Sequence, residues 1–382
     1  MLNLHVAMDN GNSEQDMFFN GVPVAGPNVY ARVQSLPNLD EVDPKKVMGD
    51  IHNNLIAEVE DQLYYIGAYA LDPNQHCRSI QVGVDNDKVS SSIVFINTLA
   101  HTAAEAVSLA SQSKDKAVRK AFDEGTVNAE VDMATAIPVS YYTAEAAHTL
   151  EDKFTEKTHS VKVYVGPISY TVTLTYSFVK VIPEGVTAAH AFLAEPERYF
   201  GKGVTSETLQ DARILHVAIG EGTTEFPITT GVGFDPNFIS GTDNGNGHAI
   251  KRVLDPFKKN FGLRSITRQD FSRYIREDSH KYHNAAMDYL MPALEDEAVD
   301  ILAKAEQVIA EANNEIDAVA VYGGGSILMK EFLRPRLEAY CRRARIQLIY
   351  IEDPTEAVFL EAEGLNAFLN SGLFQYLKEH AA

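Results

Sequence analysis

Short apolar runs rich in valine, isoleucine and threonine recur along the chain and predict β-strands. They cover residues 4–8, 17–24, 64–70, 131–140, 161–165, 170–181, 209–218, 225–228, 318–322 and 346–351. Apolar side chains at helical spacing predict helices over 87–112, 264–313 and 354–377. The last helical region is expected to break near Gly364 and Gly372, and 28–60 is expected to be irregular. Strands mixed with long helices predict an α/β fold.

One arrangement occurs twice along the chain: a strand, a glycine-containing turn and a second strand. The first copy turns at 9–13, and the second follows the strand 209–218 and turns at 220–224. A supersecondary unit that recurs past the middle of a chain indicates two domains of common design. We therefore predict one domain over 1–212 and a second over 213–382.

The first turn has the composition of a metal and phosphate site. It consists of Asp9, Asn10, Gly11, Asn12 and Ser13. A carboxylate at a strand end can hold Mg²⁺, usually through water, and glycine lets the backbone turn so that N–H groups face a phosphate. The alternative is an ordinary hairpin, because the Asn-Gly pair favours a type I′ turn.

Three further loops carry glycine where a ligand would approach closely. They are Gly220-Glu221-Gly222-Thr223-Thr224, Gly323-Gly324-Gly325-Ser326 and Gly245-Asn246-Gly247-His248-Ala249-Ile250. A run of three glycines between a buried strand and a helix is hard to attribute to core packing, and a helix start suits an anion. The structural alternatives are a bulged hairpin, a tight strand–helix turn, and common turn and N-cap residues. No Walker-type or G-x-G-x-x-G loop occurs in the sequence.

The composition of the chain limits which binding partners and which cellular compartment are expected. The net charge is −20, with 53 acidic against 33 basic residues, and no basic run forms a phosphate-binding face, so direct nucleic-acid binding is not expected. Cys77 and Cys341 are too few for a disulfide framework, which favours a reducing cytoplasm. No apolar run approaches the roughly 20 residues of a membrane span, and the N-terminus is not expected to be a signal peptide.

The order of the loops resembles a known superfamily. Strand–Asp-x-Gly, strand–Gly-x-Gly-Thr-Thr and strand–Gly-Gly-Gly-Ser are similar to the nucleotide loops of actins, sugar kinases and heat-shock chaperones. The likeness is closest to the plasmid-segregation actins, the ParM and Alp group. Three connecting segments of that group are similar to Val179–Glu184, Ile137–Ser140 and Asp353–Ala357 with the region of Gly364. The resemblance covers nearly the whole chain.

This resemblance implies an α/β, actin-like fold. Two RNase H-like domains would surround a nucleotide cleft, each with a small inserted subdomain. The insertions would cover about 28–90 in the first domain and about 255–315 in the second. The last helix would pack back on the first domain.

The implied ligand is ATP or GTP with Mg²⁺. Asp9 would approach the metal and serve catalysis, and Glu184 would orient the water that attacks the terminal phosphate. The nucleotide contacts would come from Gly11, Asn12, Ser13, Gly220, Gly222, Thr223, Thr224, Gly247, Gly323, Gly324, Gly325 and Ser326. Without the resemblance, Glu184 is best interpreted as a solvated turn acid after Pro183.

Two positions depart from the family pattern. The lysine that usually follows the first aspartate by seven residues is Asp16 here, so a lysine comes from elsewhere or the hairpin is shifted. The aspartate that usually begins the second loop is Ala218, which offers no oxygen. We therefore expect nucleotide binding with impaired hydrolysis, whether Ala218 is native or an introduced change. An Ala218→Asp variant with unchanged phosphate release would contradict this expectation.

The resemblance implies a filament of copies of this chain, linked to plasmid DNA by a basic adaptor, with no membrane attachment. The main alternative is a sugar or acid kinase of the same superfamily, for which the sequence offers no convincing catalytic aspartate. A chaperone ATPase, with its long substrate-binding region, and a membrane-bound shape-determining actin, with its exposed apolar segment, are not expected. His280 and His283 follow Asp278 at a helical spacing that metal ligands use. We expect these three side chains instead to lie on a solvated face of a helix.

Overall fold

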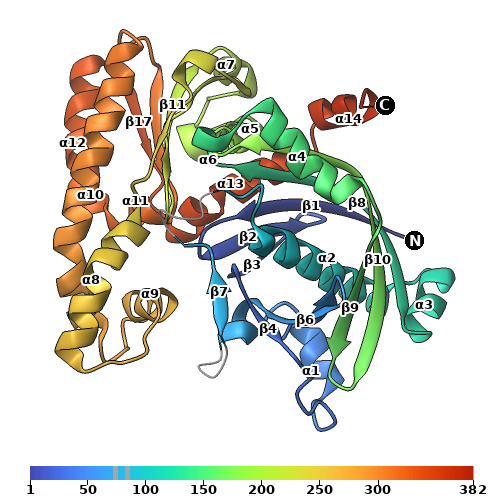
Figure 1. The fold of residues 1–382 in the computed structure, drawn as a ribbon. Coiled ribbons are helices and arrows are strands. Elements are labelled where there is room, and N and C mark those ends of the chain that lie inside the picture. The colour runs from blue at the N-terminus through green and yellow to red at the C-terminus, as the bar shows by residue number, and fades with distance from the viewer. Residues whose placement is uncertain (72–75, 82–86, 382) are drawn as a thin grey trace.

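A computed structural model describes residues 1–71, 76–81 and 87–381. Two β-sheets, each accompanied by helices, lie side by side (Figure 1). The described strands of the first sheet are β1 (Leu2–Asn10), β2 (Glu14–Phe19), β3 (Val22–Pro27), β4 (Val29–Val33), β5 (Ile56–Val59), β6 (Gln62–Ile66), β7 (Cys77–Ser79), β8 (Thr126–Ile137), β9 (His159–Val165) and β10 (Ile168–Pro183). Their order across the sheet is β3-β2-β1-β8-β10-β9-β5-β6-β4-β7.

The second sheet is built from the later part of the chain. Its strands are β11 (Arg213–Ile219), β12 (Thr224–Glu225), β13 (Ile228–Thr230), β14 (Gly233–Phe234), β15 (Gly241–Thr242), β16 (Ala318–Tyr322) and β17 (Gln347–Tyr350). In both sheets the leading strand forms a hairpin and also pairs in parallel with a later strand: β1 with β2 and β8, and β11 with β12 and β16. The repeat that the sequence predicts is therefore present in the topology.

Helices cover both sheets. In the first half of the chain they are α1 (Pro44–Gly49), α2 (Ser92–Gln112), α3 (Lys116–Asp123), α4 (Ala144–Thr155), α5 (Thr187–Ala194), α6 (Pro196–Phe200) and α7 (Ser206–Gln210). In the second half they are α8 (Asn246–Phe261), α9 (Arg268–Arg276), α10 (His283–Glu311), α11 (Gly324–Leu328), α12 (Lys330–Ala344), α13 (Pro354–Leu369) and α14 (Gly372–Glu379). Short 3₁₀ turns occur at Gly67–Leu71, Val139–Tyr141 and Pro236–Phe238.

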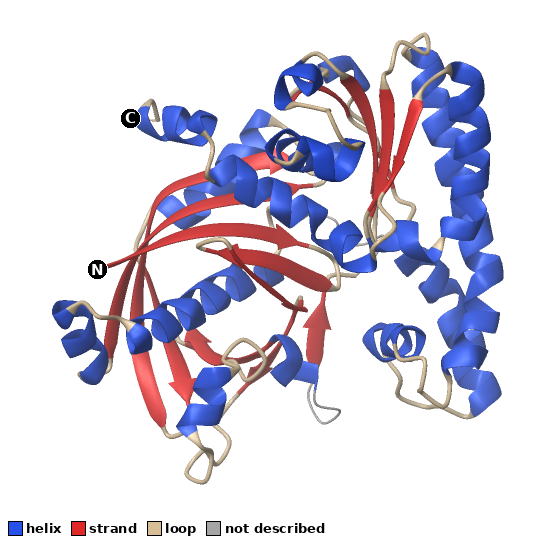
Figure 2. Cartoon of the chain, turned by 180° about the vertical axis from the view of Figure 1, so that it is seen from behind, coloured by secondary structure: helices blue, strands red, loops and turns tan. Residues whose placement is uncertain are grey.

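Helix α2 packs against one face of the curved first sheet, and α8, α10 and α12 form a column on the outer side of the second sheet (Figure 2). By length and composition α2 is apolar enough to cross a membrane, contrary to the sequence expectation that no segment is. Most of it, 78%, is buried inside the protein, as expected of a core helix. Its Ser91 cap accepts a hydrogen bond from the Val94 N–H and starts the helix.

The predicted insertion at about 28–90 contributes β4 to β7, which extend the first sheet beyond β9 through antiparallel pairing of β5 with β9. Residues 72–75 and 82–86 of that range lie outside the described residues. The segment 28–60 is not irregular as predicted, because it contains β4, α1 and β5. Its short strands lack a long apolar run, so pairing with neighbouring strands, and not local pattern, defines them.

The predicted strand 17–24 is also two strands. It breaks at Asn20 and Gly21, whose φ angles of 50° and 82° are those of a type I′ turn between β2 and β3. No described residue of the turn at Gly11 has positive φ, so the first Asn-Gly pair does not form that type of turn. The hairpin of β1 and β2 itself is confirmed.

Gly364 does not break the last helical region, which continues through it as α13. A side chain at Gly364 would collide with the Thr187 carbonyl oxygen at the start of α5. The glycine is therefore a close-packing residue inside a helix, and not a stop signal. The break near Gly372 is confirmed, since α14 begins there.

Candidate functional site

The first predicted loop, Gly11–Ser13, joins β1 to β2 and is held by buried amides. The Asn28 N–H donates to the Ser13 carbonyl oxygen at 2.8 Å. The Asn28 side chain donates to the Gly11 carbonyl oxygen at 2.8 Å and accepts from Asn97 on α2, also at 2.8 Å. Asn28 is fully buried, so these bonds define the loop's shape.

The second predicted loop connects β11 to β12. Its hairpin register places Ala218 opposite Glu225 and Ile219 opposite Thr224. The Gly220 N–H donates to the Thr223 carbonyl oxygen at 2.9 Å and closes the turn. The hydroxyl of Thr224 donates to a backbone carbonyl, that of Asn244, at 2.8 Å.

The start of α8 lies directly against this second loop. The Gly247 N–H donates to the Glu221 carbonyl oxygen at 2.9 Å, and His248 Nε2 lies 2.9 Å from the Gly222 carbonyl oxygen. A side chain at Gly245 would approach the Gly220 carbonyl oxygen to 2.7 Å. Close backbone approach therefore explains Gly245.

The glycine run at 323–326 meets the same loop from the other side. Gly323 has φ of 92°, and a side chain there or at Gly325 would collide with Ile219 at the end of β11. At Gly324 the nearest atom to a side chain would be Val358 Cγ2, at 3.7 Å. The Ser326 hydroxyl donates to the Gly323 carbonyl oxygen at 2.8 Å. Packing against β11 thus accounts for two of the three glycines.

A single arginine links the first and second loops. Arg268, the first residue of α9 after the capping residue Thr267, forms an ion pair from Nε to Glu221 at 3.1 Å. Its Nη2 donates to the backbone carbonyls of Ile80 at 3.1 Å and Asn12 at 3.4 Å. All four loops that the sequence singles out therefore come together in space.

Acidic side chains gather beside these loops around Lys88. The Lys88 ammonium is 4% exposed and is paired with the carboxylate of Glu184. Burial raises the pKa of Asp9 to about 6, an effect that Lys88 opposes and Glu184 reinforces. Burial lowers the pKa of Lys88, but Glu184 and Asp9 outweigh it, so that the net shift is upward. The lysine is therefore held in its charged form by its neighbours.

The position of Glu184 is fixed by the backbone hydrogen bonds of the next residue, Gly185. The Gly185 N–H donates to both carboxyl oxygens of Glu361 on α13, at 3.1 and 3.2 Å. The Tyr322 hydroxyl donates to the Gly185 carbonyl oxygen at 3.0 Å. Burial, followed by Asp9 and Glu184, raises the pKa of Glu361 well above its usual value. Glu184 therefore sits at the end of β10 on a backbone fixed by α13 and β16.

Asp16 lies directly opposite Asp9 across the first hairpin, so the hairpin is not shifted. Its pKa is raised well above the usual range by burial, then by Asp9 and Glu14. The nearby cation is Lys88, which comes from the loop before α2. The sequence expectation that a lysine arrives from elsewhere agrees with this geometry, although sequence reasoning did not identify Lys88.

Sequence reasoning also missed Glu225. It is 2% exposed, and burial, followed by the charge of Glu184, raises its pKa to about 8. A usable signal was present, because Glu225 follows Ala218 by the same spacing that separates Asp16 from Asp9. No such signal exists for Lys88, which lies in an irregular segment 96 residues from Glu184.

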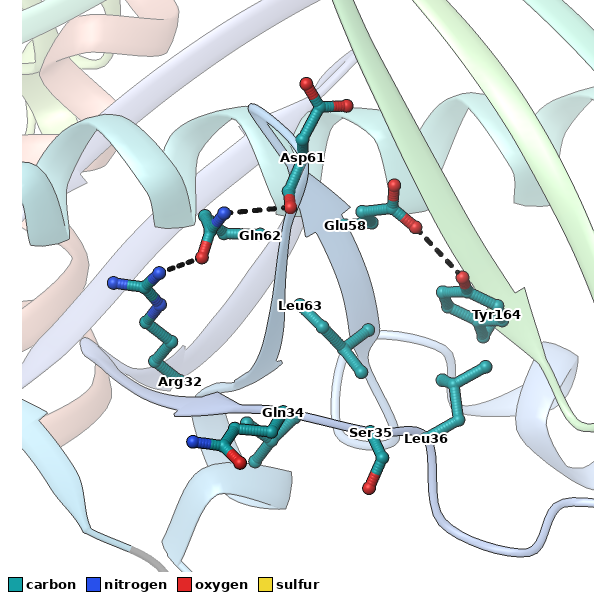
Figure 3. Close-up of a pocket in the computed structure, with 10 residues that line it drawn as sticks. Arg32, Gln34, Ser35, Leu36, Glu58, Asp61, Gln62, Leu63 and Tyr164 are labelled. Carbon is teal, nitrogen blue, oxygen red and sulfur yellow. Dashed lines mark hydrogen bonds between the residues drawn. The ribbon is translucent and has the colours of Figure 1, made fainter.

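A cavity of about 700 Å³ lies elsewhere, among β4, β5, β6 and β9 of the first sheet (Figure 3). It is lined by Arg32, Val33, Gln34, Ser35, Leu36, Glu58, Asp61, Gln62, Leu63 and Tyr164. Its polar side chains satisfy one another, as in the bond from the Tyr164 hydroxyl to Glu58 at 3.1 Å. None of the predicted site residues lines it.

The histidine pair near α10 is engaged with protein groups. His280 stacks on Tyr274 with ring centroids 4.1 Å apart, and His283 Nδ1 lies 3.1 Å from the Tyr274 carbonyl oxygen. Among the described residues no group of three histidine, cysteine or acidic side chains is arranged to hold a metal. These contacts account for the helical spacing.

No protein family and no curated protein matches this chain in sequence. Solved structures do match it along its length. The actin-like protein Alp7A shares 17% identity, full coverage of both chains and a TM-score of 0.70. Ta0583, an archaeal actin homolog in complex with ADP, shares 16% identity over 97% of this chain and 100% of its own, with a TM-score of 0.66. A non-polymerisable quadruple mutant of pCBH ParM shares 16% identity over 96% and 98%, with a TM-score of 0.65. The chain therefore has the actin-like fold. Its first two predicted loops follow the leading strands β1 and β11 of the two sheets.

Proposed function

We propose that this protein is a nucleotide-dependent, polymerising ATPase or GTPase whose filaments segregate plasmid DNA through a DNA-bound adaptor. The observation that carries the proposal is the convergence of four glycine-containing loops beside Asp9, Glu184 and Lys88 in an actin-like fold. An ADP complex and a non-polymerisable variant among the similar structures support nucleotide binding and polymerisation respectively.

The terminal phosphates would lie between the first and second loops. Backbone N–H groups from the two turns suit an anion. Gly11, Asn12 and Ser13 would contact the phosphates from one side, with Gly220, Gly222, Thr223 and Thr224 opposite and Gly247 and Gly323 to Ser326 toward the nucleoside. Since the Thr224 and Ser326 hydroxyls already donate to backbone carbonyls, their part would be to shape the loops.

The acidic residues fit a divalent cation. Asp9 and Asp16 face each other across the hairpin, and a carboxyl oxygen of Asp16 lacks a hydrogen-bond partner among the described residues. Buried carboxyl groups of this kind require a counter-charge, and hard oxygen ligands suit Mg²⁺. Asp9 would hold the ion through water, and the ion would neutralise charge on the phosphates.

Glu184 would accept a hydrogen bond from the attacking water. Its carboxyl group is paired with Lys88, and a carboxylate within hydrogen-bond reach of a water can receive its proton. When a terminal phosphate enters, Lys88 has a second anion to contact. In this proposal the lysine exchanges part of its pairing with Glu184 for the phosphate.

The filament and its adaptor agree with the charge of the chain. A net charge of −20 opposes direct contact with DNA phosphates, so a basic adaptor would bridge the two. Such a filament would work in the bacterial cytoplasm, and head-to-tail contacts between copies would leave it open-ended.

Light scattering and electron microscopy with ATP, GTP and Mg²⁺ test the proposal. We expect scattering to rise after nucleotide addition, and filaments to be visible on grids. A matched sample without nucleotide is the control. Absence of filaments in every condition, together with phosphate transfer to a sugar or acid, would overturn the proposal in favour of the kinase.

A further inference from the structure

The two hairpins of the fold show where a missing carboxyl group is replaced. In the first hairpin Asp9 faces Asp16, and in the second Ala218 faces Glu225. Residues directly opposite in an antiparallel pair project from the same face, with Cβ atoms roughly 5 Å apart. The carboxyl group that is absent from β11 is therefore present on the same face of the hairpin, carried by β12.

The surroundings of Glu225 leave room for its carboxyl group. A side chain at Gly241 on β15 would collide with that group, and one at Gly185 would lie 3.3 Å from the Glu225 Cβ. Glycine at 241 leaves room for the carboxyl group, whereas a side chain at Gly185 would first meet the Pro227 ring, at 2.7 and 2.9 Å. Gly185 directly follows Glu184, so the two glutamates belong to neighbouring backbones.

Neither carboxyl oxygen of Glu225 has a hydrogen-bond partner among the described residues. The Thr223 hydroxyl and the Val139 N–H lower its pKa somewhat, but neither makes a bond of standard geometry. A side chain that is 2% exposed and unpartnered costs free energy in the absence of a ligand. Such a group is suited to a polar ligand that completes its bonds, and a water molecule meets that need.

The charged groups that face Glu225 set its protonation. They are Glu184 at the end of β10, Lys88 before α2, and the hydroxyl of Tyr322 on β16. With a pKa raised to about 8 by burial and then by Glu184, Glu225 retains its proton at neutral pH, while the carboxyl group of Glu184 is paired with Lys88. Neighbouring carboxyl groups in different surroundings can play different parts at one pH.

We propose that Glu225 orients the water that attacks the terminal phosphate, and so supplies from β12 the carboxyl group that Ala218 cannot supply from β11. This inference rests on the proposed nucleotide hydrolysis. Glu225 is a positioning residue, and Glu184 receives the proton. The chain is then an active hydrolase despite Ala218.

The reaction balances with these two residues. The water oxygen forms a bond to the terminal phosphorus as the bond from that phosphorus to the bridging oxygen breaks, and the diphosphate leaves with the electron pair. One water proton passes to Glu184 and then to the released phosphate. The carbonyl oxygen of protonated Glu225 accepts a hydrogen bond from the second water hydrogen, which directs the lone pair toward phosphorus.

Full-length Glu225→Ala and Glu225→Gln variants test the inference through phosphate release and filament assembly. We expect Glu225→Ala to bind nucleotide and assemble, but to release phosphate roughly 10- to 100-fold more slowly. Glu225→Gln should lose less, because the amide still accepts a hydrogen bond from water. Glu207→Ala, an exposed acid on α7, is the control and should match the parent chain.

A pH profile separates water positioning from a structural role. In the parent chain, phosphate release should fall as pH rises through about 8, because ionised Glu225 then adds a negative charge that repels the terminal phosphate and Glu184. This fall in the rate at high pH should be absent from the Glu225→Gln variant, because its amide does not titrate. If Glu225 had only a structural role, the Glu225→Gln variant would release phosphate more slowly but would still show the fall in rate at high pH.

The contrary outcomes are distinguishable. If Glu225→Ala releases phosphate at the parent rate while Glu184→Gln does not, the inference fails and hydrolysis stands. If the parent chain assembles without releasing phosphate and Ala218→Asp restores release, the inference also fails, and impaired hydrolysis is correct. If the parent chain neither binds nucleotide nor assembles, the proposed function fails with it.

Discussion

The charges of individual residues determine the protonation and the stability of the proposed site before a nucleotide enters. Lys88 faces the carboxyl groups of Asp9, Glu184 and Glu225, and it is almost fully buried. A buried ion pair costs desolvation, but removing one partner leaves the others uncompensated. The acids then protonate, because a buried isolated carboxylate is expensive.

Replacing Lys88 with methionine should destabilise the protein in a pH-dependent manner. We expect the free energy of unfolding to fall by about 3 kcal/mol at pH 8. Without the lysine, the folded-state pKa of Asp9, which burial already raises to about 6, should rise further above its unfolded value, so stability should be retained at low pH and lost as pH rises through that range. Urea unfolding at pH 5 and pH 8 measures this. Lys120→Met on the surface of α3 should show no such difference, and equal losses at both pH values would contradict the prediction.

At the residue scale, the structure brings together side chains that local pattern singled out, and their roles stay predictions. Asp9 stands at the end of an apolar strand beside a glycine, and the structure places it beside Glu184, as the resemblance implies. Lys88 and Glu361 reach the same place from distant, irregular or helical segments, and only tertiary packing brings them there. Glu225 was predictable in principle from the repeat of the seven-residue spacing.

At the scale of elements, short paired strands were predicted poorly and long periodic segments unevenly, because the predicted helix 264–313 is two helices, α9 and α10, separated at 277–282. The helix 87–112 and the strands around Gly166 correspond to α2 and to the hairpin of β9 and β10. Strands β4 and β5 were missed because their pairing partners, and not their own pattern, stabilise them. Of the four Asn-Gly pairs in the sequence, Asn20-Gly21 forms the type I′ turn that was considered as the alternative at Asn10-Gly11, since the dipeptide alone does not specify which turn adopts positive φ.

Gly364 gives an element-scale test of close packing between α13 and α5. Alanine normally stabilises a helix interior relative to glycine by up to about 1 kcal/mol, but here its methyl group would collide with the Thr187 carbonyl. We expect Gly364→Ala to destabilise the protein by about 2 kcal/mol, because a backbone atom cannot yield without moving α5. Thermal unfolding measures the change. Gly372→Ala at the start of α14, with open space around it, is the matched control and should be neutral or slightly stabilising.

At the scale of the whole molecule, one helix and several side-chain contacts join the halves of the fold. Helix α13 contacts β1 and β8 of the first sheet as well as β16 of the second, and its apolar residues enter core clusters on both sides. The side-chain contacts include Arg268 between Glu221 and the backbone at Asn12, the ion pair of Arg276 with Glu14, and the Tyr322 hydrogen bond to Gly185. The predicted boundary near residue 212 stays a prediction, although the first sheet ends before it and the second begins after it.

Arg268→Ala should loosen the two halves without unfolding either. The arginine is mostly buried and pairs with Glu221, so its loss removes a charge-assisted link and frees α9 from the first loop. We expect small-angle scattering to show a larger radius of gyration, and nucleotide affinity to fall about 10-fold, because the loops must then be brought together on binding. Arg273→Ala on the same helix is the matched control, since Arg273 pairs with Asp270 inside α9 and should leave both quantities unchanged. If both variants behave alike, Arg268 does not hold the halves together, and α13 with the remaining contacts, such as Arg276 with Glu14, carries the link.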